Sequence, residues 1–161
     1  ALDADEQRLE RVRQNLSRLG HSAQLVVGDA SSPEGDWAAT GYDRILADVP
    51  CTATGVMRRH PDIRILRREE DVAALVARQR EILQALWRLL RPGGKLLYAT
   101  CSLLPQENRQ QVAQFMQMRG DARSIPLSCP GGVTAGHGLQ LLPVDREMDG
   151  FFYALLEKKA A

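Results

Sequence analysis

The sequence predicts an α/β domain with a mostly parallel sheet and an antiparallel pair of strands at one edge. Two patterns lead to this prediction. Helical periodicity alternates with short apolar strands over most of the chain, and two strand patterns then follow each other near the C-terminal end without a helix between them. The length of 161 residues, with 44% hydrophobic and 25% charged residues, suits one domain with a single core.

The first half of the chain predicts one helix and two strands. A helix is expected over residues 4–19, where four apolar residues recur at helical spacing and Gly20 provides a stop. The sequences "AQLVVGD" (23–29) and "YDRILAD" (42–48) follow as strands.

The second half begins with the longest predicted helix, over residues 70–90. A turn "RPGG" (91–94), a strand "KLLYATC" (95–101) and a helix from Pro105 to about Met118 come next. The last two predicted strands are "LQLLP" (139–143) and "FFYALLEK" (151–158), joined by a polar turn that contains "DREMDG" (145–150).

Composition narrows the classes of function. The net charge of +1 gives no overall attraction to nucleic acid or membrane, so any electrostatic site must be local. The chain has neither an apolar run long enough to span a membrane nor an N-terminal signal-peptide pattern. Its three cysteines are odd in number and widely spaced, which argues against a disulfide framework or a zinc site and fits a reducing cytosol.

Three predicted strands end in a chemically useful side chain: Asp29, Asp48 and Cys101. In open α/β sheets ligands bind beyond the carboxyl ends of the strands. Cys51 follows "DVP", where the proline stiffens the loop, so Asp48, Cys51 and Cys101 converge if strands 42–48 and 95–101 are neighbours. Taken singly, each has a plainer interpretation: a small buried thiol, or an aspartate that caps a turn.

A basic segment, "RRHPDIRILRR" (58–68), follows directly and holds five arginines against one acid. Guanidinium groups bind phosphate in a forked geometry, so Arg58, Arg59 and Arg64 are candidates to contact a nucleic-acid backbone. The alternative is an ordinary solvated loop, since arginine is abundant throughout this chain.

The motifs "DVPCTATGVMRRHPD" and "YATCSLLPQEN" together resemble the paired motifs of the RNA cytosine-5 methyltransferases. The resemblance runs through essentially the whole chain, and within the family it is greatest to the bacterial members that methylate small-subunit (16S) ribosomal RNA. It implies a Rossmann-like methyltransferase fold, S-adenosylmethionine as cofactor, RNA as partner, and a catalytic domain over residues 1–161. The departure at Val49, where the family usually has alanine, is tolerable in extended backbone.

The resemblance also implies a role for each matched residue. Cys101 would attack C6 of a flipped-out cytosine, and Cys51 would assist loss of the C5 proton and release of the product. Asp48 would lie beside both base and cofactor. Asp3 would hold the ribose hydroxyls of the cofactor, and Asp29 would lie next to its adenine.

The beginning of the chain departs from the family pattern. The residues "ALD" resemble the end of a strand, and no glycine-rich strand-to-helix loop precedes them. We therefore expect a fragment that lacks the first strand and the cofactor loop, with a gap between the strands that end at Asp3 and Asp48. Weak binding of S-adenosylmethionine, or none, is the expected consequence.

Two alternatives remain open. One is a non-catalytic RNA-binding or scaffold domain that retains the fold, and the other is a methyltransferase acting on DNA or on another base. Among the remaining polar residues, Glu107 and Asn108 match the family pattern, but their place in the first turn of a helix favours capping. Cys129 is expected to be a loop thiol.

Overall fold

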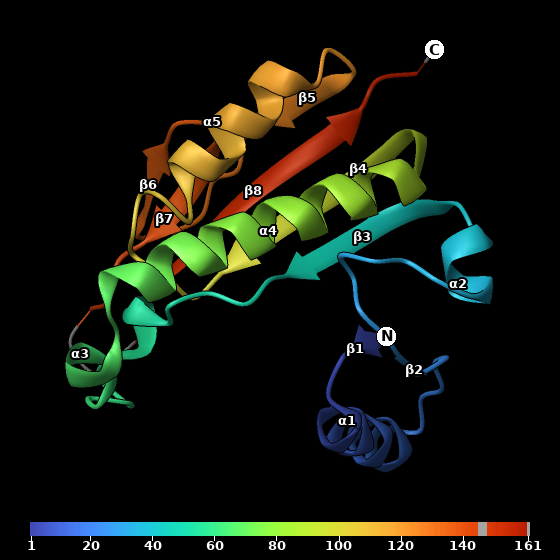
Figure 1. The fold of residues 1–161 in the computed structure, drawn as a ribbon, viewed down its shortest axis with the longest axis horizontal. Coiled ribbons are helices and arrows are strands. Elements are labelled where there is room, and N and C mark those ends of the chain that lie inside the picture. The colour runs from blue at the N-terminus through green and yellow to red at the C-terminus, as the bar shows by residue number, and fades with distance from the viewer. Residues whose placement is uncertain (145–147, 161) are drawn as a thin grey trace.

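The computed structural model describes residues 1–144 and 148–160, whose arrangement is shown in Figure 1. Residues 145–147 of the predicted polar turn lie outside this part of the chain. In chain order the elements are β1 (Leu2–Asp3), α1 (Glu6–Leu19), β2 (Val26–Val27), α2 (Asp36–Ala39), β3 (Tyr42–Asp48), the 3₁₀ turn η1 (Thr54–Val56), α3 (Ile63–Leu66), α4 (Glu69–Leu89), β4 (Leu90–Thr100), α5 (Arg109–Met118), β5 (Ala122–Ile125), β6 (Gly132–Ala135), β7 (Gly138–Leu141) and β8 (Phe151–Lys158).

The central sheet has six strands in the order β3-β4-β8-β7-β6, with β5 also paired to β8. β3 and β4 run parallel, whereas β8 is antiparallel to β4, β5 and β7. The α/β class is confirmed, but the sheet is mixed and not mostly parallel. The reason lies after α5, where β5 to β8 follow one another through short connections, which favour antiparallel neighbours.

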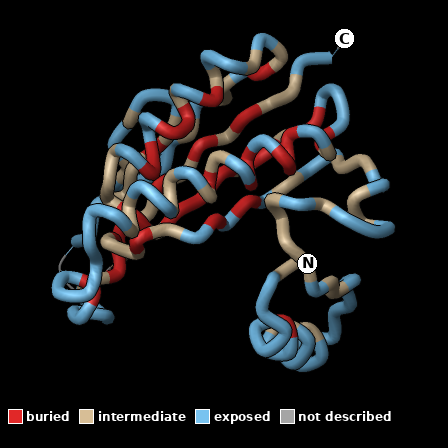
Figure 2. Tube along the Cα trace, in the orientation of Figure 1, coloured by how far each residue is buried: buried red, intermediate tan, exposed pale blue. Residues whose placement is uncertain are grey.

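Helices α4 and α5 pack on one face of the central sheet, and the hydrophobic core lies between the sheet and these helices (Figure 1). Buried positions recur along α4, β4 and β8, separated by partly exposed ones (Figure 2). Trp87 and Phe115 meet edge to face with ring centroids 5.2 Å apart. On β8, Phe152 and Leu156 point into this core at the alternating period of a strand. Each fully buried side chain of this size stabilises the fold by about 1.5–3 kcal/mol.

Strands β1 and β2 form a separate two-stranded parallel sheet beside α1 (Figure 1). Helix α1 ends at the predicted Leu19, where Gly20 follows in left-handed geometry with φ of 68°, but it begins at Glu6 and not at residue 4 because Asp5 caps its start. Across the described residues, β1 pairs only with β2, and β3 pairs only with β4. One edge of β1 and one edge of β3 therefore carry backbone groups without a strand partner.

Several predicted boundaries need correction. The predicted turn 91–94 is an irregular part of β4, where the register against β3 shifts between Tyr42 and Arg44. Helix α5 begins at Arg109 and not at Pro105. Strands β5 and β6 were not predicted, since each has only four residues.

Among the described residues, no helix is long and apolar enough to cross a membrane. Across residues 1–144 and 148–160, no group of three or more histidine, cysteine, aspartate or glutamate side chains could hold a metal ion.

Candidate active site

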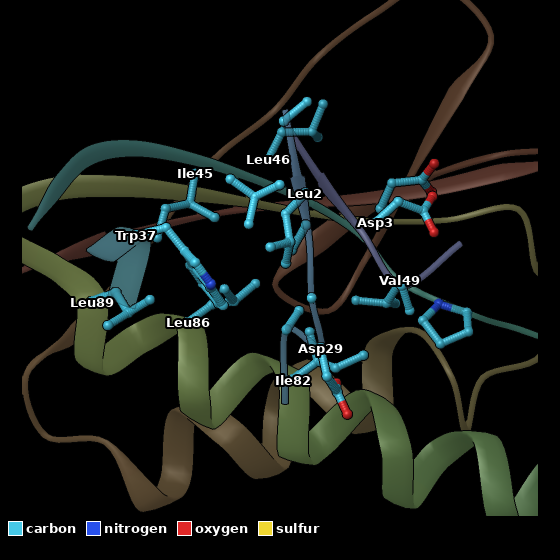
Figure 3. A pocket seen from close by; sticks show the side chains of 18 of the residues that line it. Leu2, Asp3, Asp29, Trp37, Ile45, Leu46, Val49, Ile82, Leu86 and Leu89 are labelled. Atoms are coloured by element: carbon cyan, nitrogen blue, oxygen red, sulfur yellow. The ribbon is translucent and has the colours of Figure 1, made fainter. Parts of the chain in front are cut away.

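A cavity of about 770 Å³ lies between the β1–β2 pair and β3. Figure 3 shows apolar side chains from α4, β3 and α2 at one end of it, and Asp3 and Asp29 toward the other. All five residues predicted to act on base or cofactor line this one cavity: Asp3, Asp29, Asp48, Cys51 and Cys101. Side chains separated by up to 98 positions in the chain thus share one wall.

The parallel pairing of β3 and β4 brings the two thiols together. Asp48, the last residue of β3, is paired with Ala99, two residues before Cys101. Cys51 follows on the stiff Val49-Pro50 loop, and its sulfur lies 3.3 Å from the sulfur of Cys101. Both thiols are half-buried, so each remains accessible from the cavity.

The contact between the two sulfurs shifts the pKa values of the two thiols in opposite directions. The hydrogen bond from Cys51 lowers the pKa of Cys101 to about 7, although burial opposes this change. The same hydrogen bond, together with burial, raises the pKa of Cys51 well above its ordinary value. At neutral pH about half of the Cys101 thiol is therefore ionised, whereas Cys51 remains a thiol.

Asp48 reaches solvent through the cavity, but surrounding protein atoms displace part of its hydration. This desolvation raises the pKa of the Asp48 carboxyl. Its negative charge also raises the pKa of Cys101 and of Tyr153 on β8, which shows that all three groups share one electrostatic environment. A carboxyl group that protonates more readily than usual can donate a hydrogen bond to a ligand.

Close backbone packing fixes the loops that carry the thiols. The Gly55 N–H donates to the Cys101 carbonyl over 2.9 Å, and the Gly55 carbonyl accepts from the Gly150 N–H, also at 2.9 Å. A Cβ atom at Gly55 would lie only 2.1 Å from the Gly150 carbonyl oxygen. Only glycine allows these three segments to approach so closely.

The two aspartates predicted for the cofactor sit at the ends of β1 and β2. Asp3 Oδ1 accepts from the Asp5 N–H at 2.9 Å, and the side chain is 32% exposed. The carboxylate of Asp29 is held by Arg78 of α4, 2.5 Å away, and by Ser31. These contacts, led by the hydrogen bond from Arg78, lower the pKa of Asp29 to about 2.

The three predicted RNA-contacting arginines lie outside the cavity wall. Arg58 and Arg59 reach Asp149 over 3.5 Å and 2.6 Å, beside the Gly55–Gly150 junction. Arg64 is exposed on α3. A further arginine, Arg67, donates from Nε to the Thr52 carbonyl at 3.0 Å and ties α3 to the loop that follows Cys51.

Glu107 has a different place from the one predicted. It is fully buried, and its carboxylate accepts from Thr52 and Ser102, the residues that follow the two cysteines. The capping interpretation is therefore wrong for Glu107, and the side chain of Asn108, at the start of α5, makes no capping hydrogen bond. The match of Glu107 and Asn108 to the family motif was the one indication of a role at the site. The prediction followed their position at the start of a helix instead.

The part of the cavity beside Asp3 and Asp29 suits the cofactor that the sequence implies. Asp3 lies at the end of β1, and its partly exposed carboxylate can accept hydrogen bonds from the ribose hydroxyl groups of the cofactor. The site lies at the carboxyl ends of parallel strands, where nucleotide-type ligands bind in α/β sheets.

Solved structures define the class of protein. The chain superimposes on the crystal structure of PH0851 with a TM-score of 0.87 and 34% identity, covering 98% of this chain and 36% of that one. NSun6 from Pyrococcus horikoshii, solved with SFG, gives a TM-score of 0.84 and 29% identity over 100% of this chain and 41% of its own. The chain has the Rossmann-like fold of S-adenosylmethionine-dependent methyltransferases, as predicted.

The particular family follows from the sequence match. The family model "16S rRNA methyltransferase RsmB/F" matches residues 1–157, and the chain belongs to this family. Ribosomal RNA small subunit methyltransferase B of Vibrio cholerae is 54% identical over 159 residues, and its counterpart in Sodalis glossinidius is 52% identical over 159. In both cases the match covers 99% of this chain and 36% of the relative, so the chain spans about a third of their length.

Proposed function

We propose that the protein transfers a methyl group from S-adenosylmethionine to C5 of a cytosine in 16S ribosomal RNA, through a covalent bond between Cys101 and C6. The observation that carries the proposal is the pair of sulfurs 3.3 Å apart in the wall of the cavity. The family description and the names of the relatives support small-subunit ribosomal RNA as the substrate.

Cys101 is the nucleophile in this proposal. With a pKa of about 7, roughly half of its thiol is ionised at neutral pH, which suits attack on an electron-poor ring. As the Sγ–C6 bond forms, the electron pair of the 5,6 double bond moves into the ring, and C5 becomes nucleophilic. Asp48 stabilises the added charge by a hydrogen bond to the ring, helped by its raised pKa. The bound cofactor supplies an electrophilic methyl group.

Cys51 completes the reaction by removing the C5 proton. Its pKa is high mainly because of Cys101, so covalent capture of the Cys101 sulfur removes that cause. Cys51 then releases its own proton to water, and the thiolate accepts the proton from C5. The electron pair of the C5–H bond restores the double bond as the Sγ–C6 bond breaks, which returns Cys101 as a thiolate.

RNA binding is proposed to use Arg58, Arg59 and Arg64, and the setting is the cytoplasm, where ribosomal RNA is available in bacteria. The ion pairs with Asp149 hold Arg58 and Arg59 close to the catalytic loops. Each guanidinium has five N–H donors, so donors remain for phosphate oxygens after these contacts. The target base must leave any stack to reach Cys101, at a cost of a few kcal/mol in a duplex.

We also propose that residues 1–161 are part of the catalytic domain and that a further strand belongs between β1 and β3. The unpaired edges of these strands and the cavity between them support this proposal. Leu46 on β3 is 68% exposed, which leaves an apolar side chain uncovered at that edge. Calorimetry on residues 1–161 should then detect little binding of S-adenosylmethionine, whereas tight binding by this chain alone would refute the proposal.

The proposed activity is tested with the complete protein, a 16S ribosomal RNA transcript and S-adenosylmethionine. Bisulfite sequencing should reveal 5-methylcytosine at a defined position, and Cys101→Ala should abolish the signal. Methyl transfer to a different atom or base would contradict the proposal. RNA binding without any transfer would instead support the alternative of a non-catalytic scaffold.

A further inference from the structure

A buried carboxylate lies behind the thiol pair, outside the cavity wall. Glu107 is 0% exposed, and four donors from three parts of the chain converge on it. Oε1 accepts from the Thr52 N–H at 2.8 Å and from Gln79 Nε2 at 3.0 Å. Oε2 accepts from the hydroxyls of Thr52, at 2.5 Å, and of Ser102.

These donors are adjacent to the reactive sulfurs. Thr52 directly follows Cys51, and Ser102 directly follows Cys101, so one carboxylate bonds the neighbours of both thiols. Gln79 adds a third anchor, since its Nε2 also donates to the Pro50 carbonyl at 2.9 Å. Glu107 therefore links the two cysteine loops to the rigid helix α4.

We infer that Glu107 is the positioning residue of the thiol pair: its carboxylate holds the Cys51 and Cys101 loops together and thereby sets the spacing of the two sulfurs. The link between that spacing and turnover rests on the proposed function. The spacing itself is a property of the folded protein and can be measured without RNA or cofactor.

The chemistry of the group supports this role. A buried charge is costly unless hydrogen bonds compensate it, and four donors provide that compensation here. A carboxylate is acceptor-only with two oxygens, so it can accept from all four donors at once, which a hydroxyl cannot do. The carboxylate does not cap α5, which leaves the loops as its structural partners.

A second set of contacts shows that the Cys101 loop is held from several sides. Thr54 Oγ1 accepts from the Leu103 N–H at 2.9 Å, which joins the two loops again. Asn108 Nδ2 donates to the Ser102 carbonyl at 2.8 Å. These contacts fix the backbone. The hydroxyl oxygens of Thr52 and Ser102 also lie 3.3 Å apart, and Glu107 accepts from both residues.

The test measures whether the two thiols can be captured together. Phenylarsine oxide bridges two thiols only when they lie close to each other, and peptide mapping identifies the bridged pair. The reagent is applied to the complete protein carrying Cys129→Ser, because Cys129 is exposed. Glu107→Ala, Glu107→Asp and Glu107→Gln are compared with Gln111→Leu. This control removes a buried amide that, among the described residues, donates to the Val76 carbonyl on α4 and makes no contact with the cysteine loops.

Glu107→Ala should lower the rate of bridging at least tenfold, and Glu107→Asp, whose shorter chain cannot reach both loops, should lower it severalfold. Glu107→Gln should keep the rate of bridging within about twofold of the wild-type rate. The amide has the same shape as the carboxylate, and the hydroxyls of Thr52 and Ser102 can rotate to accept hydrogen bonds from its NH₂ group. Gln111→Leu should leave the rate unchanged while lowering thermal stability. Bridging at the wild-type rate in Glu107→Ala overturns the inference; if that variant does not fold, the same result in Glu107→Asp does so.

A pH profile separates positioning from general destabilisation. In Glu107→Ala the sulfurs should move apart, so Cys101 should lose the hydrogen bond that lowers its pKa, and its alkylation midpoint should rise above about 7. In Glu107→Gln the pair stays together without the nearby negative charge, so the midpoint should fall. Midpoints that do not move in either variant contradict the role. If bridging behaves as expected but RNA methylation is absent in the wild type, the proposed function fails and the positioning role stands.

Discussion

Replacing Cys51 by alanine should change the acidity of Cys101 in a measurable way. The hydrogen bond from Cys51 is the main cause that lowers the pKa of Cys101 to about 7. Without it, burial and the charge of Asp48 still raise the pKa, so the pKa should reach at least its ordinary value of about 8.5. The thiolate fraction at pH 7 then falls from roughly one half to about 3% or less, which is a decrease of at least about fifteenfold.

The rate of alkylation should fall less than the thiolate fraction. A more basic thiolate is intrinsically more nucleophilic, by about fivefold for this change, so the rate at pH 7 should fall only about threefold. The midpoint of the pH profile is therefore the cleaner measurement. Iodoacetamide labelling across pH 5–10, with mapping of Cys101, should show the midpoint rising from about 7 to about 8.5 or higher. A midpoint that stays near 7 in Cys51→Ala would refute this explanation, and Cys129→Ala serves as the control.

Three further predictions concern stability and RNA binding. Gly55→Ala should lower the free energy of unfolding by about 3 kcal/mol in chemical denaturation, because its Cβ would overlap the Gly150 carbonyl, whereas Gly120→Ala, which meets no atom within 4 Å, should change it little. Arg78→Met should raise the pKa of Asp29 from about 2 toward its ordinary value, as measured by carbon-detected NMR titration. The ion pair stabilises the fold above the pKa that Asp29 has in the unfolded chain, and this effect is lost as the pH falls toward 2. Because both side chains are largely exposed, the variant should lose no more than about 1 kcal/mol of unfolding free energy at pH 7. Arg64→Ala should weaken RNA binding and reduce the salt dependence of log K by about 0.7, and an unchanged slope would exclude a phosphate contact.

Much of the fold was predictable because its longest elements carry strong local patterns. β3 and β8 have the predicted bounds, and α4 differs from its predicted span by one residue at each end. β5 and β6 were missed because strands of four residues show too little alternation to be told from loops. β2 is only two residues long because its one hydrogen-bonded neighbour among the described residues is equally short.

The site was partly predictable for a related reason. The ends of neighbouring parallel strands meet at one edge, so Asp48 and Cys101 could be placed together from their positions alone. The partners of Glu107 and Asp29 could not be found in this way. Thr52 is 55 positions from Glu107, and Arg78 is 49 positions from Asp29, and no local periodicity records such contacts.

The central claim is that the two thiols have different tasks on one cytosine. The most direct measurement is covalent trapping of the complete protein on RNA in which the target cytosine is 5-azacytidine, followed by denaturing electrophoresis. Wild type and Cys51→Ala should both form the adduct, Cys101→Ala should form none, and only Cys51→Ala should also accumulate an adduct with ordinary RNA. An adduct that survives in Cys101→Ala, or that requires Cys51 as its point of attachment, would contradict the account.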